Sequence, residues 1–143
     1  MTNPNVKSEQ ATKQCLTLNS KQTQMSKPQN SKPYDLRERT LRFAKMVRNY
    51  VKSLPKTLSN IEDARQLIKA SGSVGANYIE GEEALSRKDF LMRIKISRKE
   101  AKESGYWLEL TEPKEEQVME KQNLTREATE LTKIFGSIVE KSK

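Results

Sequence analysis

Four carboxylates lie close together in the middle of the chain, at Glu80, Glu82, Glu83 and Asp89. Carboxylates alone can hold Mg²⁺, so the chemistry open to this cluster is metal-assisted hydrolysis. However, the four residues straddle the predicted end of a helix, and no nucleophile is positioned beside them. The sequence has no histidine, and its one cysteine, Cys15, lies in a polar leader. Zinc sites, Cys-His or Ser-His-Asp machinery and an internal disulfide are therefore excluded, and the sequence predicts no enzyme, no metal site and no cofactor.

A second candidate for chemistry is the glycine-rich stretch around Gly72 and Gly75, in the segment 70–110 that also holds the single tryptophan. A phosphate-binding loop would need the third glycine of a dinucleotide fingerprint or a following GK[ST] sequence, and both are missing. The small residues Ser71, Gly72, Gly75 and Ala76 keep helical spacing instead. Another helix can approach such a surface closely. The pattern therefore favours close helix packing over phosphate binding.

The basic residues carry the strongest functional signal. The formal net charge of +8 at pH 7 makes a polyanion the first partner to consider, either a nucleic acid or an anionic membrane surface. A solvated helix face usually mixes both signs of charge, whereas every charged position in the segment 39–56 is basic. The segment 87–102 is also mainly basic, and the segment 109–130 is mainly acidic. Opposite charges could therefore meet across the protomers of an oligomer.

Four segments with the apolar spacing of amphipathic helices must position these residues. A capping box at Ser59 opens the second helix, Gly81 is a natural stop for it, and Ser86 is the predicted N-cap of the third. No stretch alternates as a strand would. The sequence therefore predicts an all-α, antiparallel, up-down-up-down four-helix bundle. The predicted helices span residues 35–54, 59–81, 86–110 and 115–140.

The 143 residues suit one folded domain, predicted over residues 33–143. Residues 1–32 are rich in Asn, Gln, Ser, Thr and Lys and lack aromatic residues, which predicts a disordered basic leader. Met25 offers a second possible start, so the true start is either Met1 or Met25. No apolar run approaches the roughly 20 residues that cross a bilayer, and the N-terminus lacks the apolar core of a signal peptide. We therefore expect a cytoplasmic protein without a membrane partner.

Three apolar residues of the third predicted helix, Met92, Ile96 and Trp107, project from a face that differs from its core stripe. A monomeric four-helix bundle would leave these side chains in water. The sequence therefore predicts a homo-oligomer that buries them at its interface.

Four stretches carry a family resemblance: YDLRERTLRFA, IKASGSVGANYIEGEEALSRKDF, KEAKESGYWLEL and LTREATELTKIFGSIVEK. The most specific parts are SVGANYIEG at residues 73–81, Asp89-Phe90 and Tyr106-Trp107-Leu108. Together they resemble the bacterial four-helix-bundle family of 23S ribosomal RNA intervening-sequence proteins, over residues 33–143. The resemblance implies a ring-like homopentamer with a positively charged surface and no enzymatic activity. The family is also similar to the accessory variability protein of diversity-generating retroelements, which implies nucleic acid and a reverse transcriptase as partners.

Two functions remain open at this point. The first is a non-catalytic, oligomeric scaffold that binds the backbone of RNA or DNA largely without regard to sequence, because phosphate contacts give affinity but little base readout. The second is a protein-interaction ring that docks an acidic partner protein without nucleic acid. The residues assigned to phosphate contacts in the first function are Arg39, Arg42, Lys45, Arg48, Lys52, Lys95, Lys99 and Lys102.

Overall fold

The structure, a computed structural model of the chain, describes residues 35–143, so the predicted leader and the possible start at Met25 lie outside the described residues. Four long helices follow one another in this part: α2 (Leu36–Lys52), α3 (Leu58–Glu82), α4 (Arg87–Leu110) and α5 (Val118–Lys141). A single 3-10 turn, η1 (Glu115–Gln117), precedes α5. Residues 35–143 contain no strand, and the predicted all-α four-helix fold is confirmed.

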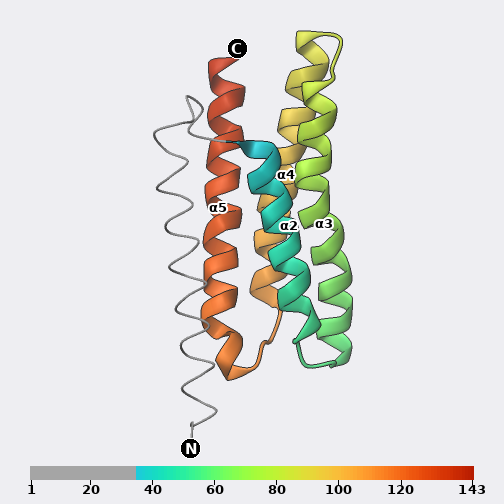
Figure 1. Ribbon diagram of the computed structural model, residues 1–143, viewed down its shortest axis with the longest axis vertical. Coiled ribbons are helices and arrows are strands. Elements are labelled where there is room, and N and C mark those ends of the chain that lie inside the picture. Colours follow the sequence, from blue (N-terminus) through green and yellow to red (C-terminus); the bar gives the residue numbers. More distant parts are fainter. Residues whose placement is uncertain (1–34) are drawn as a thin grey trace, which may run out of the picture. The chain divides into compact units, whose positions relative to one another are not determined.

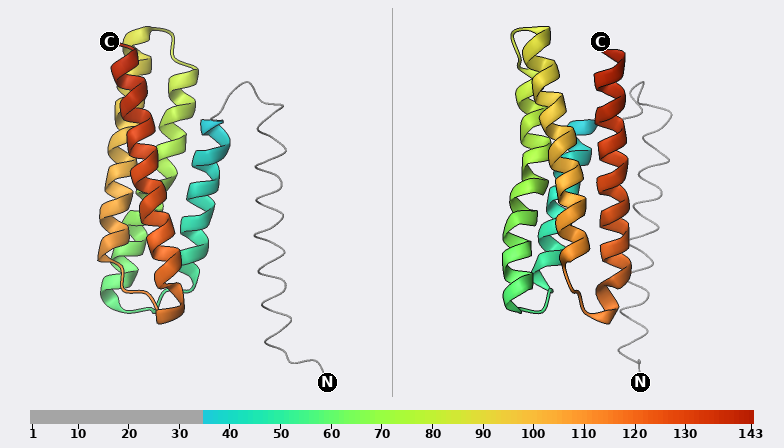
Figure 2. Two further views of the ribbon diagram at one scale, coloured as in Figure 1. Left: turned by 90° about the vertical axis from the view of Figure 1, so that its left-hand side faces the viewer. Right: turned by 180° about the vertical axis from the view of Figure 1, so that it is seen from behind.

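Consecutive helices of the bundle run in opposite directions (Figure 1). Both α2 and α4 pack against α3 and α5, so α2 and α4 occupy opposite corners of the bundle. Figure 1 shows α2 in front of α4, and the view from behind in Figure 2 shows α4 in front. The contact between α3 and α4 is the most extensive, and that between α2 and α5 is the smallest of the four. Because the helices surround a shared core, the outer faces of α2 and α4 point to opposite sides.

Each helix contributes a stripe of buried side chains at three- and four-residue spacing, as an amphipathic helix must. In α2 the buried stripe contains Phe43, Val47 and Tyr50, and in α5 it contains Leu131 and Phe135. The ring of Phe135 lies 6.0 Å from that of Tyr78 on α3, between centroids. These apolar stripes form one continuous core, which explains why the helical periods of the sequence were sufficient to predict the fold.

The predicted close packing of the small residues on α3 is confirmed. A Cβ atom added at Gly75 would lie 2.8 Å from the Oγ1 atom of Thr40 on α2, so only glycine fits this approach. On the other side of α3, the Oγ atom of Ser97 on α4 donates a hydrogen bond of 2.9 Å to the carbonyl of Val74. Ser71 is completely buried between its neighbours. This stretch therefore positions α3 close to both α2 and α4.

The start of α3 differs from the prediction. The N-cap is Thr57 rather than Ser59, and its side chain accepts a hydrogen bond from the backbone N–H of Asn60. Asn60 itself is buried, and its amide donates to the carbonyls of Pro55 and Glu112, both at 2.9 Å. Because Thr57 is the cap, α3 begins two residues earlier than it would with a cap at Ser59, and Asn60 in its first turn joins two loops at one end of the bundle.

The predicted end of α3 near Gly81 is confirmed to within one residue, since the helix ends at Glu82, but Gly81 is not the residue that stops it. It lies within α3, has no positive φ, and is buried with its Cα facing Arg93 and Ile94 of α4. A Cβ atom added at Gly81 would lie 3.3 Å from the Cβ atom of Arg93, so α4 passes close to this glycine. The predicted N-cap of α4 is confirmed, since the Ser86 hydroxyl accepts a hydrogen bond from the backbone N–H of Asp89.

Candidate nucleic-acid interface

The outer side of α2 carries four cations that face solvent: Arg42, Lys45, Arg48 and Lys52, here named the α2 basic face. Arg48 donates one hydrogen bond to the carbonyl of Ala44 in its own helix. Within residues 35–143, no ion pair or hydrogen bond engages the side chains of Arg42, Lys45 and Lys52. Their positive charges are therefore available to a partner.

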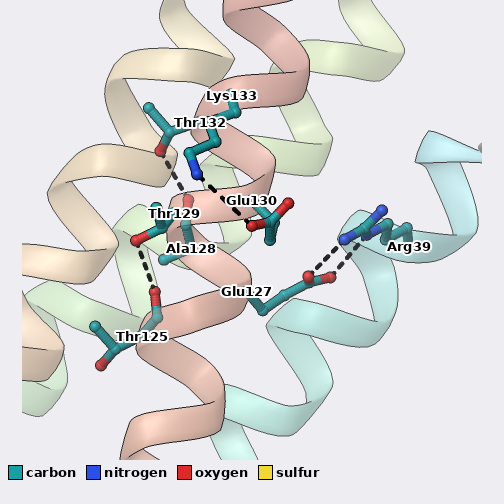
Figure 3. Close-up of polar contacts among 8 residues, drawn as sticks. All are labelled: Arg39, Thr125, Glu127, Ala128, Thr129, Glu130, Thr132 and Lys133. Carbon is teal, nitrogen blue, oxygen red and sulfur yellow. Dashed lines mark hydrogen bonds and ion pairs between the residues drawn. The ribbon is translucent and has the colours of Figure 1, made fainter.

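Arg39, the fifth cation of α2 that we assigned to phosphate, is held inside the protomer. Its guanidinium donates two hydrogen bonds to the carboxylate of Glu127 on α5, at 2.9 and 2.7 Å (Figure 3). The two side chains are only 28% and 25% exposed. The opposite charges of α2 and α5, which we expected to meet across protomers, thus meet here within one chain.

The side of α5 near this pair is occupied by local contacts. Glu130 pairs with Lys133 at 3.9 Å, and the hydroxyls of Thr129 and Thr132 donate to backbone carbonyls of their own helix (Figure 3). Toward α3, Arg37 pairs with Glu82 at 3.1 Å. The α2 basic face is therefore bounded on both sides by ion pairs that neutralise the neighbouring charges.

The outer side of α4 carries a second row of exposed cations. Lys95, Lys99 and Lys102 follow one another at spacings of four and three residues, which places them on one line of the helix. Lys88 continues this line two turns earlier, and we name these four residues the α4 basic face. Within the described part of the chain, none of the four makes a hydrogen bond or an ion pair.

Glu100 and Glu103 border the α4 basic face. Burial raises the pKa of the Glu100 carboxyl, and the nearby Glu103 raises it further, while the positive charges of Lys99 and Lys69 oppose both effects. Glu100 is therefore an unfavourable negative charge at neutral pH that adjoins the row of lysines.

Other cations of α4 have structural roles that the sequence did not reveal. Arg93 donates a hydrogen bond of 3.0 Å to the side-chain oxygen of Asn77 on α3. Arg87 donates two hydrogen bonds to the carbonyl of Ser142, at the C-terminal end of α5. Both arginines contribute to the basic composition of the segment, but their side chains join α4 to α3 and to the end of α5. The α2 and α4 basic faces are also separate surfaces, because their helices occupy opposite corners.

The three residues predicted to form an oligomer interface do not form a uniformly exposed facet. Met92 is 48% exposed, whereas Ile96 and Trp107 are half-buried. Trp107 packs against the core, and its indole N–H donates a hydrogen bond of 3.1 Å to the carboxylate of Glu103. The neighbouring residue, Tyr106, is more exposed, at 56%, and sequence reasoning assigned it no role. The sequence feature that could have identified Tyr106 is its position four residues after Lys102, on the same line of the helix as the lysines.

The carboxylates at Glu80, Glu82, Glu83 and Asp89 are not assembled into a metal site. Among residues 35–143, no group of three or more His, Cys, Asp or Glu side chains is placed to hold a metal ion.

A surface groove of about 530 Å³ lies between the end of α4 and the start of α5, and its lining includes Lys121. The Lys121 ammonium donates hydrogen bonds to two backbone carbonyls at the end of α4 and so caps the C-terminus of that helix. No helix in the described part of the chain is long and apolar enough to span a bilayer.

The fold and its surfaces define an all-α bundle protein with two separate rows of exposed cations. The chain belongs to the family described as "23S rRNA-intervening sequence protein", whose profile matches residues 32–137. It is similar to the crystal structure of a protein with unknown function from the S23 ribosomal protein family of Bacteroides thetaiotaomicron VPI-5482. That protein is 32% identical over 72% of this chain and 96% of its own, with a TM-score of 0.63. A search of curated proteins finds no match.

Proposed function

We propose that this protein is a non-catalytic nucleic-acid-binding scaffold that contacts mainly the phosphate backbone. The observation that carries the proposal is the presence of two rows of exposed cations, none of which has an ion-pair partner within residues 35–143. Cations left without internal partners can neutralise phosphates and release the counterions condensed on the nucleic acid, which is the main source of sequence-independent affinity. The formal net charge of +8 supports the same choice of partner.

The composition of the α4 basic face supports backbone contacts rather than base readout. Base readout in a duplex requires an element that enters a groove and presents side chains able to form bidentate hydrogen bonds with base edges. The α4 basic face consists of lysines, which act as point charges on flexible stems. Affinity should therefore fall steeply with salt and vary little with sequence.

The test compares two triple variants by electrophoretic mobility shift at about 50 and 200 mM salt. In one variant Gln replaces Arg42, Lys45 and Arg48, and in the other it replaces Lys95, Lys99 and Lys102. Each variant should weaken RNA binding by about 10- to 100-fold and lower the salt dependence, because about three phosphate contacts are lost. All six positions are exposed, so the free energy of unfolding should change by no more than about 1 kcal/mol.

The matched control replaces Arg65 of α3 and Arg126 and Lys141 of α5 by Gln. These three cations are exposed and have no ion-pair partner within residues 35–143, so the change removes the same net charge from other surfaces. This variant should retain most of the affinity. If both face variants fold correctly and bind RNA as tightly as the wild type, the proposal is wrong. The two faces would then be assigned to docking of an acidic partner protein, which does not need nucleic acid.

The predicted homopentamer and the association with a reverse transcriptase stay predictions. For the pentamer, the support from Met92 is clearer than that from Ile96 and Trp107, because the latter two are partly covered within the protomer. Light scattering provides the direct measurement, and the mass of a single chain would contradict assembly.

A further inference from the structure

Tyr106 extends the line of lysines on α4. The residues Lys95, Lys99, Lys102 and Tyr106 follow at spacings of four, three and four, so all four side chains leave the helix on the same side. At 1.5 Å per residue, this line is about 16 Å long. It begins with positive charges and ends with an aromatic ring.

The ring of Tyr106 is both exposed and supported from behind. It stacks on the Trp107 ring at a centroid distance of 5.2 Å and an interplanar angle of 13°. Trp107 is itself held by the core and by its hydrogen bond to Glu103. Because the supporting ring is held in place, little further ordering of side chains is needed before another flat group can stack on Tyr106. A tyrosine that is 56% exposed leaves room for such a group.

We propose that the α4 basic face binds single-stranded nucleic acid, with phosphates on its lysines and one base stacked on Tyr106. This inference rests on the proposed nucleic-acid function and adds the class of nucleic acid. Bases in a duplex are stacked on one another and their flat faces are covered, whereas unpaired bases can stack on aromatic side chains. The α2 basic face has no equivalent ring, because Phe43 and Tyr50 are 1% and 0% exposed. Of the two basic faces, only that of α4 therefore carries the preference for single strands.

The test measures binding of the full chain to a fluorescent oligouridine of about 12 nucleotides and to a duplex of the same length. Tyr106→Leu keeps an apolar side chain against Trp107 but removes the aromatic face. It should weaken binding to the single strand about tenfold. Tyr106→Phe keeps the aromatic face and should bind within about twofold of the wild type. Both variants should bind the duplex as the wild type does, because that contact is electrostatic.

The possible outcomes separate this inference from the function on which it rests. If the wild type binds neither oligonucleotide at low salt, the nucleic-acid function and the Tyr106 site are both wrong. If it binds both and Tyr106→Leu changes neither affinity, only the Tyr106 site is wrong. If Tyr106→Leu instead lowers the mass measured by light scattering and leaves the affinity for the single strand unchanged, Tyr106 belongs to a contact between copies of the chain. That result would also overturn the proposed site.

Discussion

The outer faces of α2 and α4 look alike in sequence and differ in structure. Both present a row of cations, but the α2 basic face lies between two ion pairs, Arg39 with Glu127 and Arg37 with Glu82. The α4 basic face adjoins a partly buried acid and ends at an exposed aromatic ring. Neighbouring helices thus decide which charges remain available and what lies next to them. A row of basic residues predicts affinity for a polyanion, whereas its surroundings determine which polyanion fits.

The largest change in stability should come from a substitution that displaces α2 from α3. Gly75→Ala would place a Cβ atom 2.8 Å from the Thr40 hydroxyl oxygen, and Thr40 is buried and bonded at 2.6 Å to the carbonyl of Leu36. Either α2 or Thr40 must shift. We expect the free energy of unfolding to fall by about 1–3 kcal/mol, despite the better helix propensity of alanine. Urea unfolding measures this change.

Gly72→Ala is the matched control in the same helix. Its added Cβ would meet only the flexible end of Arg48, at 3.4 Å, so the propensity gain should dominate. We expect this variant to be more stable than the wild type by up to about 1 kcal/mol. Equal effects of the two substitutions would show that the close approach of α2 to α3 does not depend on Gly75.

A smaller effect should separate Arg39 from the α2 basic face. Arg39→Gln breaks a bidentate, partly buried ion pair, so the free energy of unfolding should fall by about 1 kcal/mol. RNA affinity should stay within about twofold, because this charge is already neutralised by Glu127. Arg42→Gln, on the same helix, should do the opposite and weaken binding while leaving stability within about 0.5 kcal/mol. Thermal unfolding and gel shifts of both variants provide the measurements.

A double-mutant cycle with Glu127→Gln checks the origin of that loss. If the pair is responsible, the double variant should lose less stability than the sum of the two single variants. If Arg39→Gln weakens RNA binding as much as Arg42→Gln does, Arg39 must be returned to the phosphate-contacting set.

Much of the fold could be predicted because it depends on local patterns. Apolar periods placed all four helices, and the N-cap Ser86 and the close packing at Gly75 follow from residue type and spacing. The predicted end of α3 was right to within one residue, but the role of Gly81 as its stop was wrong. A glycine that ends a helix and one that admits a neighbouring helix look identical in sequence. Only the position of α4, with Arg93 and Ile94 against Gly81, distinguishes them.

The candidate site was harder to predict because it depends on which helices are neighbours. Arg39 and Glu127 are 88 positions apart, and no local pattern joins them. The sequence assigned Lys95, Lys99 and Lys102 to phosphate contacts together with the cations of α2, whereas the structure places the two groups on helices at opposite corners. Helical spacing also predicted the face from which Trp107 projects, but it could not show that the ring packs against the core. The more exposed of these two neighbouring rings is that of Tyr106.

The smallest expected effect concerns Glu100, one of the two acids beside the α4 basic face. Burial raises the pKa of its carboxyl, so the folded protein retains the proton to a higher pH than the unfolded chain does. This contribution to stability is fully present below the unfolded pKa and is lost as the pH rises through the higher folded pKa. At neutral pH the ionised carboxylate therefore costs stability, and Glu100→Gln should stabilise the protein there by at most about 0.5 kcal/mol.

The pH dependence and the RNA affinity identify the cause of this stabilisation. Near pH 4, where the wild-type carboxyl is largely protonated, the advantage of Glu100→Gln should disappear. Glu83→Gln makes the same change of charge at an exposed position outside α4 and serves as the control. Glu100→Gln should also strengthen RNA binding slightly, because it removes a negative charge beside Lys99. A gain in stability that is the same at both pH values would show that the gain does not come from removing a buried charge. The α4 basic face would then have no destabilising carboxylate beside it and would not differ from the α2 basic face in this respect.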